Sequence, residues 1–78
     1  MSKSTEEEVL EVYRRHLREP DLGLDDVFAD HGGHSLIAFR ILAEFRRLFP
    51  VTPQTEDFED LTIARTMAGW LRRENAGT

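Results

Sequence analysis

Apolar residues recur at three- and four-residue intervals along residues 35–49, and this spacing constrains the fold more than any other feature of the chain. At about 100° per residue, one broad arc of a helix collects the side chains of Ile37, Ala38, Ile41, Leu42, Phe45, Leu48 and Phe49. A second arc carries Arg40, Glu44 and Arg47. The spacing predicts an amphipathic helix that begins near Ser35 and ends before Pro50, with the first arc in the core and the second in solvent.

A second helix is predicted near the N-terminus. Ser4 or Thr5 can cap it, with Glu7 or Glu8 in the answering position of a capping box. Its apolar face consists of Val9, Tyr13 and Leu17. Because a proline interrupts helical hydrogen bonding, we expect this helix to end before Pro20.

The C-terminal third of the chain predicts one short and one longer helix. Residues 51–60 should contain a short helical turn that is capped by Thr55 and points Phe58 inward. The longer helix should begin near Thr62, and its apolar face consists of Ile63, Met67, Trp70 and Leu71. An aromatic residue in such a stripe is more often core than cofactor pocket, so we interpret Trp70 as a packing residue.

A long connection, residues 19–34, joins the first two helices. Because a loop of this length is rarely left loose in a compact domain, we expect its apolar residues to pack onto the core, with Phe28 as the anchor. These residues are Leu22, Leu24, Val27 and Phe28. Asp25, Asp26 and Asp30 are interpreted either as caps of local turns or as a recognition surface for a modifying enzyme.

Together these elements predict an all-α fold, a small four-helix bundle of three main helices and one short helix with a long loop between the first two. We expect residues 1–78 to form one domain, with an ordered core over about residues 5–73 and flexible ends.

The composition excludes several kinds of site. The chain has no cysteine, so disulfides and thiolate metal sites are excluded. Its net charge of −5 argues against nucleic-acid binding. No apolar run approaches the ~20 residues of a membrane span, and we expect a cytoplasmic monomer.

The segment Gly32–Leu36 places a lone hydroxyl, that of Ser35, at the start of the predicted central helix. The two glycines allow backbone angles that other residues resist, and they leave the hydroxyl accessible to another macromolecule. A catalytic serine would need a general base, an orienting acid and oxyanion donors, and the hydrolase elbow has a second glycine after the serine that this chain lacks. Ser35 is therefore interpreted as a substrate or, if its neighbours are ignored, as a plain N-cap.

The residues Asp26, Val27 and Phe28, followed by Gly32–Leu36, resemble the phosphopantetheine attachment motif of peptidyl carrier proteins, the thiolation domains of nonribosomal peptide synthesis. The resemblance covers almost the whole chain, from Glu8 to Arg73. It implies that a phosphopantetheinyl transferase attaches 4′-phosphopantetheine from coenzyme A to Ser35. The terminal thiol of this arm would then carry an aminoacyl or peptidyl group as a thioester. A phosphodiester on the first residue of a helix is also favoured by the helix dipole.

The resemblance assigns roles to the residues around Ser35. The cofactor-binding residues are Ser35 as the covalent anchor, Gly32 and Gly33 for access, and His34, which assists recognition. The implied partner surface consists of Asp26, Leu36, Phe39 and Arg46. Leu36 and Phe39 fall outside the core arc, on the flank that includes Ser35. For Phe39 an equal alternative is that it packs under the long loop.

Three positions depart from the family pattern. Ala29 stands where the family often has a second aromatic residue, and His31 stands where it usually has leucine. His34 precedes the serine, whereas carriers of fatty acid and polyketide synthesis usually have aspartate there. The last difference favours an aminoacyl or aryl cargo, and His31 affects how the loop packs.

The resemblance implies a non-catalytic, freestanding carrier that is a phosphoprotein. Its partners would be an adenylation enzyme and condensation, tailoring or thioesterase enzymes. The implied pathway is antibiotic or related natural-product biosynthesis. An excised segment of a larger synthetase would look the same. The alternatives are an acyl carrier for fatty acid or polyketide cargo, a helical adaptor without a prosthetic group and a miniature hydrolase. A metal site at Asp30, His31 and His34 is disfavoured because it needs further ligands, so no metal is expected.

Overall fold

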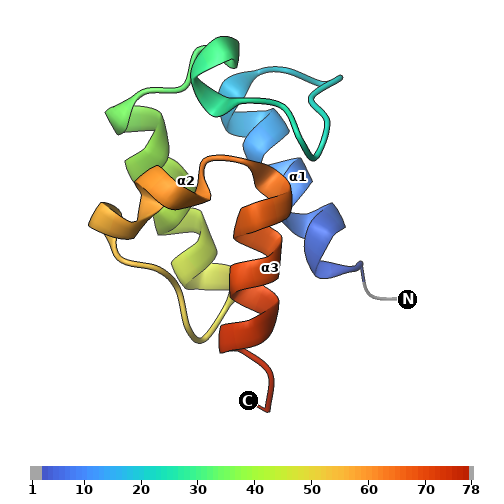
Figure 1. Ribbon diagram of the computed structural model, residues 1–78, viewed down its shortest axis with the longest axis vertical. Helices are drawn as coiled ribbons and strands as arrows, with labels where there is room; N and C mark the ends of the chain where they lie inside the picture. Colours follow the sequence, from blue (N-terminus) through green and yellow to red (C-terminus); the bar gives the residue numbers. More distant parts are fainter. Residues whose placement is uncertain (1–2, 78) are drawn as a thin grey trace.

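The computed structural model describes residues 3–77, and in this part of the chain it contains three α-helices, two 3₁₀ segments and no strand (Figure 1). The elements in chain order are α1 (Thr5–Leu17), η1 (Phe28–His31), α2 (Ser35–Leu48), η2 (Thr55–Leu61) and α3 (Ala64–Glu74). The predicted all-α bundle of three main helices and one short helix is confirmed. The segment η1 adds one turn within the long loop.

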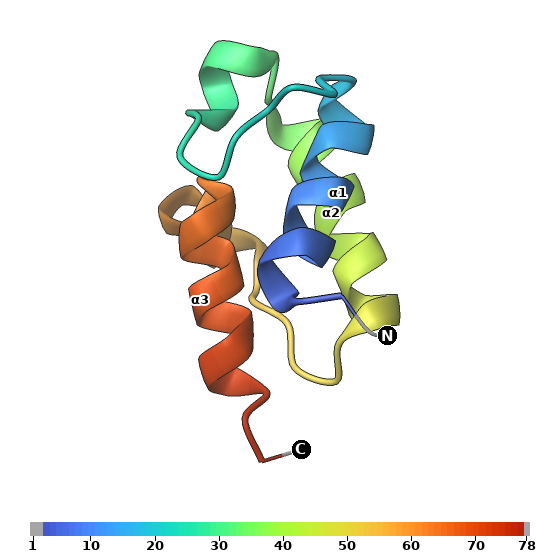
Figure 2. The ribbon, with the colours of Figure 1, turned by 90° about the vertical axis from the view of Figure 1, so that its right-hand side faces the viewer.

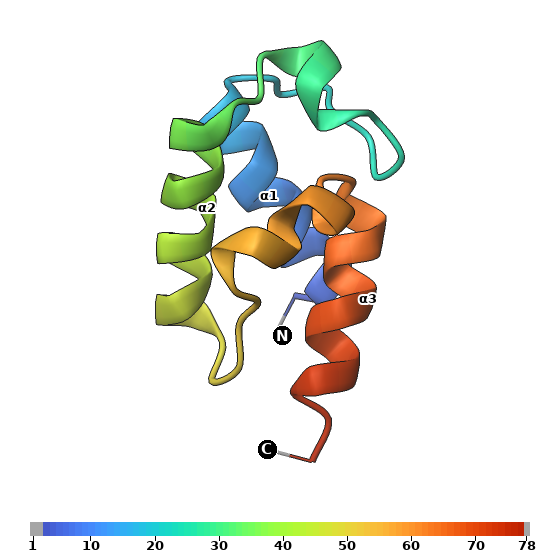
Figure 3. The same cartoon turned by 60° about the vertical axis from the view of Figure 1, so that its left-hand side comes forward.

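The helix α1 packs against both α2 and α3 (Figure 2). The short segment η2 contacts both α2 and α3, and it crosses the space between them (Figure 3). The long loop passes over one end of the bundle and leads to the start of α2 (Figure 3). The start of α2 is therefore held between a loop above it and η2 beside it. Within residues 3–77, none of the helices combines the length and the apolar character that crossing a membrane requires.

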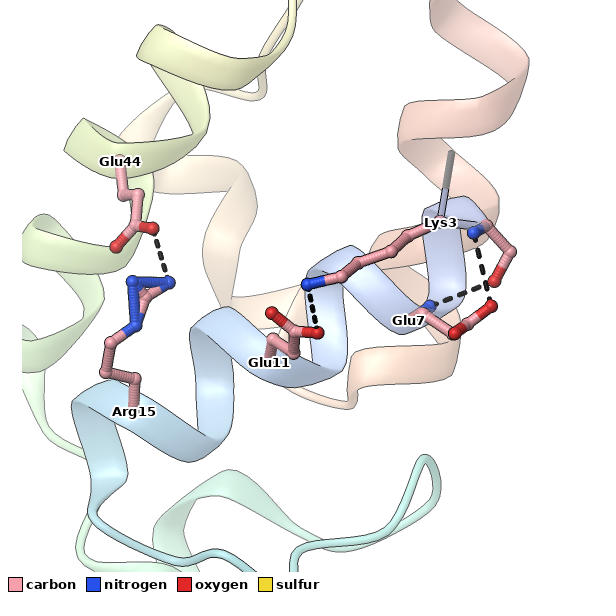
Figure 4. A network of polar contacts seen from close by, with 6 residues as sticks. Lys3, Glu7, Glu11, Arg15 and Glu44 are labelled. Atoms are coloured by element: carbon pink, nitrogen blue, oxygen red, sulfur yellow. Dashed lines mark hydrogen bonds and ion pairs between the residues drawn. The ribbon is translucent and has the colours of Figure 1, made fainter. Parts of the chain in front are cut away.

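Ser4 is the N-cap of α1. Its side-chain oxygen accepts a hydrogen bond from the Glu7 N–H at 3.1 Å, and the Glu7 carboxylate accepts one from the Ser4 N–H at 3.3 Å (Figure 4). This is the capping box that the sequence predicts. At the other end, Arg18 has a left-handed φ of 58°, and its N–H bonds to the Arg14 carbonyl oxygen. The helix therefore ends before Pro20, as predicted.

One cluster of buried apolar side chains, drawn from every element, forms the core: Val9, Val12, Tyr13, Leu22, Phe28, Ala38, Ile41, Leu42, Phe45, Phe58, Leu61, Ala64, Met67, Ala68 and Leu71. The Tyr13 ring centroid lies 6.1 Å from that of Phe28 and 6.3 Å from that of Phe58. The Tyr13 hydroxyl donates a 2.6 Å hydrogen bond to the Leu61 carbonyl oxygen. Burial raises the pKa of Tyr13, so this hydroxyl keeps its proton and ties η2 to α1.

The core arc predicted for α2 is confirmed except at its edge. Four of its residues are buried, namely Ala38, Ile41, Leu42 and Phe45. Ile37 and Phe49 are half-buried and pack against the core. Leu48 is 48% exposed, so its placement in the core was wrong. It lies at the margin of the arc and lines a surface hollow whose other lining residues are mostly charged, among them Glu11 and Arg15 of α1.

The long loop packs down, as predicted, through Leu22 and Phe28, which are both buried. Phe28 is the anchor and is 6% exposed. Leu24 is half-buried and contacts the core. Val27, however, is 46% exposed, and the expectation that it packs inward is wrong. Val27 has an extended backbone just before η1, and consecutive side chains point to opposite sides there, so only Phe28 can reach the core.

The C-terminal elements follow the prediction with shifted boundaries. The cap of η2 is Gln54 and not Thr55, because the Asp57 carboxylate accepts a 3.3 Å hydrogen bond from the Gln54 N–H. Phe58 is 4% exposed and points inward, as predicted. The helix α3 begins at Ala64, two residues after the predicted start. Three residues of its predicted apolar stripe face the core: Met67 and Leu71 are buried, and Trp70 is half-buried and is a packing residue. The fourth, Ile63, is the N-cap that precedes α3 and does not belong to the core cluster, so its place in the stripe was wrong.

The end of α3 is tied to the loop that follows α2. The Asn75 side chain accepts a 2.9 Å hydrogen bond from the Val51 N–H and donates bonds of 2.9 Å to the Val51 carbonyl oxygen and 2.8 Å to the Leu71 carbonyl oxygen. The helix itself runs through Glu74. The expectation of a frayed segment from Glu74 onward therefore fails at its first two residues. The expected flexibility of the ends also concerns residues 1, 2 and 78, which lie outside the described residues.

Candidate functional site

Ser35 is the first residue of α2, and His34 is the N-cap. The His34 backbone is extended, with φ −153° and ψ 178°, and its carbonyl oxygen accepts the first helical hydrogen bond, 2.9 Å from the Ala38 N–H. The interpretation of Ser35 as a plain N-cap is therefore wrong. Its side chain is exposed and forms no hydrogen bond with another residue in the range 3–77. The hydroxyl is available for reaction with another molecule.

The two glycines before Ser35 have different structural roles. Gly32 ends η1 in the left-handed region with φ 85°, a conformation that glycine adopts without strain. Gly33 has no such angle. A Cβ atom at position 33 would lie 2.2 Å from Cδ2 of the Phe28 ring, so the position requires glycine because the ring packs onto it. The expectation of unusual backbone angles thus holds for Gly32 only.

The turn before Ser35 is anchored to the core through Phe28. The Gly33 N–H donates a 3.0 Å hydrogen bond to the Phe28 carbonyl oxygen. The Phe28 ring lies edge-on to Phe58 of η2, with 5.3 Å between ring centroids, and edge-on to Tyr13 of α1 at 6.1 Å. The position of Ser35 is therefore coupled to three elements of the bundle, although its own side chain faces solvent.

The start of α2 offers a favourable environment for an anion on Ser35. The first N–H groups of a helix have no intrahelical acceptor, and the helix dipole places partial positive charge there. The first turn of α2 contains no acidic residue. A phosphodiester on the Ser35 oxygen would therefore meet unpaired N–H groups and no opposing carboxylate within this turn. The residues present fit a covalently bound phosphodiester.

A groove of about 650 Å³ lies beside Ser35, between the start of α2 and η2. Its lining residues are Phe28, Ala29, Gly33, His34, Ser35, Ala38, Phe39, Thr55, Glu56, Phe58, Glu59 and Thr62. The residues contributed by η2 were missed in the sequence, because a short polar segment with one inward phenylalanine carries no signal for a binding surface. The groove exists only because η2 packs against α2 (Figure 3).

Two acidic residues of the long loop are held by side-chain contacts, one within the loop and one to α3. The Asp26 carboxylate accepts a 2.7 Å hydrogen bond from the Gly23 N–H, so Asp26 caps a turn within the loop. Arg65 of α3 donates two hydrogen bonds to Asp25, of 2.8 and 3.1 Å. These bonds lower the pKa of Asp25. The turn-cap interpretation therefore describes Asp26, whereas Asp25 connects the loop to α3.

His31, which stands where the family usually has leucine, is half-buried between two carboxylates. Its Nδ1 atom lies 3.8 Å from a Glu19 oxygen, and its Nε2 atom lies 3.9 Å from an Asp26 oxygen. A polar contact within the loop thus occupies the position where leucine would make an apolar one. Among residues 3–77, no three histidine or carboxylate side chains are grouped so that they could hold a metal ion.

An exposed face of α2 runs away from Ser35. Leu36 is 52% exposed and Phe39 is 51% exposed, so the alternative that Phe39 packs under the long loop is wrong. Ala43 continues this face, and the exposed arginines of α2 surround it: Arg40, Arg46 and Arg47. None of these arginines forms an ion pair with another residue in the described range. We call these six residues, 36, 39, 40, 43, 46 and 47, the α2 stripe.

Glu44 is the acidic residue of α2, and it faces α1 instead of the α2 stripe. Its carboxylate lies 2.5 Å from a guanidinium nitrogen of Arg15 (Figure 4). It also lies 2.8 Å from Nε2 of His16. Glu44 is thus engaged with the neighbouring helix. The exposed side of α2 therefore presents apolar and cationic groups, although the whole chain carries a net charge of −5.

Comparison with known proteins places these features in a family. The family model described as "phosphopantetheine attachment site" matches residues 7–71. The chain is 33% identical over 66 residues to a probable non-canonical nonribosomal peptide synthetase, CymA, from Salinispora arenicola, and 31% identical over 68 residues to the dapdiamide synthesis protein DdaD from Enterobacter agglomerans. These matches cover 85% and 87% of this chain but 1% and 12% of the two relatives. No solved structure matches.

The family match spans η1, α2 and η2 and most of α1 and α3, and the Ser35 turn lies within it. It supports a carrier role with covalently bound phosphopantetheine as the prosthetic group, in a family whose members are generally non-catalytic carriers. The chain belongs to the phosphopantetheine attachment family of carrier domains.

Proposed function

We propose that Ser35 is the attachment point of the phosphopantetheine arm. The observation that carries this proposal is the free, exposed hydroxyl on the first residue of α2, at the end of a glycine turn and inside the matched segment. A phosphopantetheinyl transferase would join the Ser35 oxygen to the β-phosphorus of coenzyme A. The pyrophosphate bond breaks, adenosine 3′,5′-bisphosphate leaves, and a base on the transferase takes the hydroxyl proton. Gly32 and Gly33 keep side chains away from the approaching enzyme.

We also propose that the cargo is aminoacyl or peptidyl and that the pathway is nonribosomal peptide synthesis or a related one. The names of both relatives, a nonribosomal peptide synthetase and a dapdiamide synthesis protein, support this. His34 before Ser35 supports it as well, since fatty acid and polyketide carriers usually have aspartate there. When bound, the arm supplies a thiol that holds the acyl group as a thioester. An adenylation enzyme would load it, and condensation, tailoring or thioesterase enzymes would receive it.

The α2 stripe is the surface that we propose for these partners. Exposed Leu36 and Phe39 offer a small apolar contact next to the attachment point, and Arg46 lies at the far end of the same face. A small apolar patch with charged residues around it suits partners that must bind weakly and exchange. Because the arginines lack ion-pair partners within residues 3–77, a complementary surface would carry carboxylates. His34, exposed beside Ser35, would contribute to recognition.

Asp26 has a different role in this proposal. Its carboxylate is bonded to the Gly23 N–H and lies near His31, so it shapes the loop that leads to the glycine turn. Asp26 would therefore affect partner binding through the conformation of the loop as much as through direct contact.

The test is intact mass before and after incubation with coenzyme A, magnesium and a broad-specificity phosphopantetheinyl transferase. We expect the native chain to gain one phosphopantetheine and Ser35→Ala to gain none. Ser4→Ala is the matched control, because it removes a serine at another helix start while leaving the glycine turn intact. It should lose about 1 kcal/mol of stability from the missing cap but accept the arm. Addition to Ser35→Ala, or none to folded native protein, would contradict the assignment.

A further inference from the structure

The groove beside Ser35 has the size and the chemistry of a ligand site. Its volume of about 650 Å³ is within the range of small-molecule pockets, roughly 300–1,000 Å³. Phe28, Ala38 and Phe58 are buried and give it an apolar floor. Ser35 is one of its lining residues, so a group tethered to that hydroxyl starts at the edge of the groove.

The charged groups on the groove wall are all of one sign. Glu56 and Glu59, both on η2, line the groove and are exposed. Neither forms an ion pair with another residue of the described range. Although the chain has 10 lysine and arginine residues, none of them lines this groove among residues 3–77. His34 is the remaining titratable group of the lining. The groove thus combines an apolar floor with two carboxylates that lack a counter-charge.

We infer that this groove receives the acyl group carried on Ser35, and that Glu56 and Glu59 select a cargo with an apolar body and a free ammonium group, an aminoacyl cargo. This inference rests on the proposed attachment at Ser35. The apolar floor accepts the side chain of an amino acid, and the two carboxylates attract its α-ammonium group. A dicarboxylic acyl group of the malonyl type would bring a third negative charge to the same place and is disfavoured.

A weak attraction is sufficient for this selection because the cargo is tethered. A short flexible tether holds its group at an effective concentration of millimolar order. Solvent-exposed ion pairs are individually weak, so we expect each carboxylate to change groove occupancy roughly two- to fivefold. The effect should fade in 1 M salt, where the screening length is about 3 Å instead of about 10 Å at 0.1 M.

The experiment compares three forms of the native chain, which differ only in the acyl group on the phosphopantetheine arm. Coenzyme A analogues with an amide in place of the thioester are loaded by the transferase, so that the cargo cannot hydrolyse. The cargos are leucyl, 4-methylpentanoyl, which lacks the amine, and isobutylmalonyl, which has a carboxylate in its place. The readout is the backbone amide chemical shifts of Phe39, Glu56 and Glu59 relative to the protein with an unacylated arm. We expect the largest shifts with leucyl, smaller shifts with 4-methylpentanoyl and the smallest with isobutylmalonyl.

Charge-neutral variants assign the effect to the two carboxylates. In Glu56→Gln combined with Glu59→Gln, the leucyl and 4-methylpentanoyl arms should give equal shifts. Asp60→Asn is the matched control, since Asp60 is also an exposed acid of η2 but does not line the groove. It should retain the preference for leucyl. Thermal melting of each variant verifies that η2 remains folded.

The outcomes separate this inference from the proposal on which it rests. If intact mass shows that no arm is added to Ser35, both fail. If the arms load but leucyl and 4-methylpentanoyl perturb the groove equally in the native chain, only the selection by Glu56 and Glu59 is overturned. An equal loss of preference in Asp60→Asn would overturn it too, because the effect would then be a property of the overall charge.

Discussion

The Phe28 ring lies so close to the Gly33 backbone that a Cβ atom at position 33 would stand 2.2 Å from its Cδ2 atom. Gly33→Ala must therefore displace a ring that is itself packed against Tyr13 and Phe58. We expect a loss of about 1–3 kcal/mol in the free energy of unfolding, the usual cost of overpacking, measured by urea denaturation.

Gly69→Ala is the control for this substitution. Gly69 lies in α3, and a Cβ atom there would meet only the end of the flexible Arg73 side chain, at 3.4 Å. We expect this variant to be more stable by about 0.5–1 kcal/mol, because alanine favours the helix. If Gly33→Ala proved as stable as the native chain, the close packing of the ring on the turn would be wrong.

Stability should fall at alkaline pH because of Tyr13, the single tyrosine of the chain. Burial raises the pKa of Tyr13 above its usual value. Above about pH 10 the unfolded chain releases the phenolic proton while the folded protein keeps it. The unfolded state then binds fewer protons, so the free energy of unfolding decreases with a limiting slope of about 1.4 kcal/mol per pH unit. Urea titrations between pH 8 and 11 on the native chain measure the slope.

Tyr13→Phe isolates this contribution. The variant lacks the hydrogen bond to the Leu61 carbonyl oxygen, so it should lose about 1 kcal/mol at neutral pH. Its stability should then change less above pH 10 than that of the native chain. An identical alkaline slope in the two proteins would show that another group causes it.

The pair formed by Asp25 and Arg65 should be visible in the titration of the carboxylate. The hydrogen bonds from Arg65 lower the pKa of Asp25, so its contribution to stability is present above the ordinary pKa and disappears as the pH falls through the lowered value. We expect Arg65→Met to return the Asp25 pKa toward its ordinary value, measured by carbon-13 NMR of the carboxyl group. Arg72→Met, an exposed arginine of the same helix, should leave it unchanged. Equal shifts in both variants would point to a long-range charge effect.

Asn75→Ala should destabilise the bundle. It removes the hydrogen bonds to both polar groups of the Val51 backbone and to the Leu71 carbonyl oxygen, which are partly buried. We expect a loss of about 1–3 kcal/mol in the free energy of unfolding. Asn75→Asp keeps an acceptor for the Val51 N–H but turns a carboxylate oxygen toward the two carbonyl oxygens, so it should be at least as destabilising as Asn75→Ala. If both variants matched the native chain, this connection would have no role in stability.

The α2 stripe can be tested with two equally exposed apolar residues on one helix. Phe39→Ala should change stability by less than about 0.5 kcal/mol, because half of the side chain already meets solvent. It should lower kcat/KM for arm addition by the transferase about tenfold, the effect of a moderate interface contact. Leu48→Ala is the control, since Leu48 is 48% exposed but lies outside the α2 stripe. Equal effects of the two substitutions would exclude the α2 stripe as the contact surface.

Much of the fold could be predicted because helical signals are local. The capping box of Ser4 and Glu7 and the three-to-four spacing of Ile41 and Phe45 depend on neighbours within one or two turns. The anchor role of Phe28 followed from its place in a loop too long to remain loose. The glycine turn and Ser35 were recognisable for the same reason, since the motif is contiguous in sequence.

The helices, most of the faces that they bury and the serine that begins α2 were thus predictable from the residue pattern. The exposure of Leu48 and Val27 and the contact of Gly33 with the Phe28 ring were not, nor was the groove that Glu56 and Glu59 line beside Ser35. Helical periodicity shows which side of a helix is apolar. Whether a residue at the edge of that side is covered, and what faces it across a groove, depends on side chains from distant segments that packing brings together.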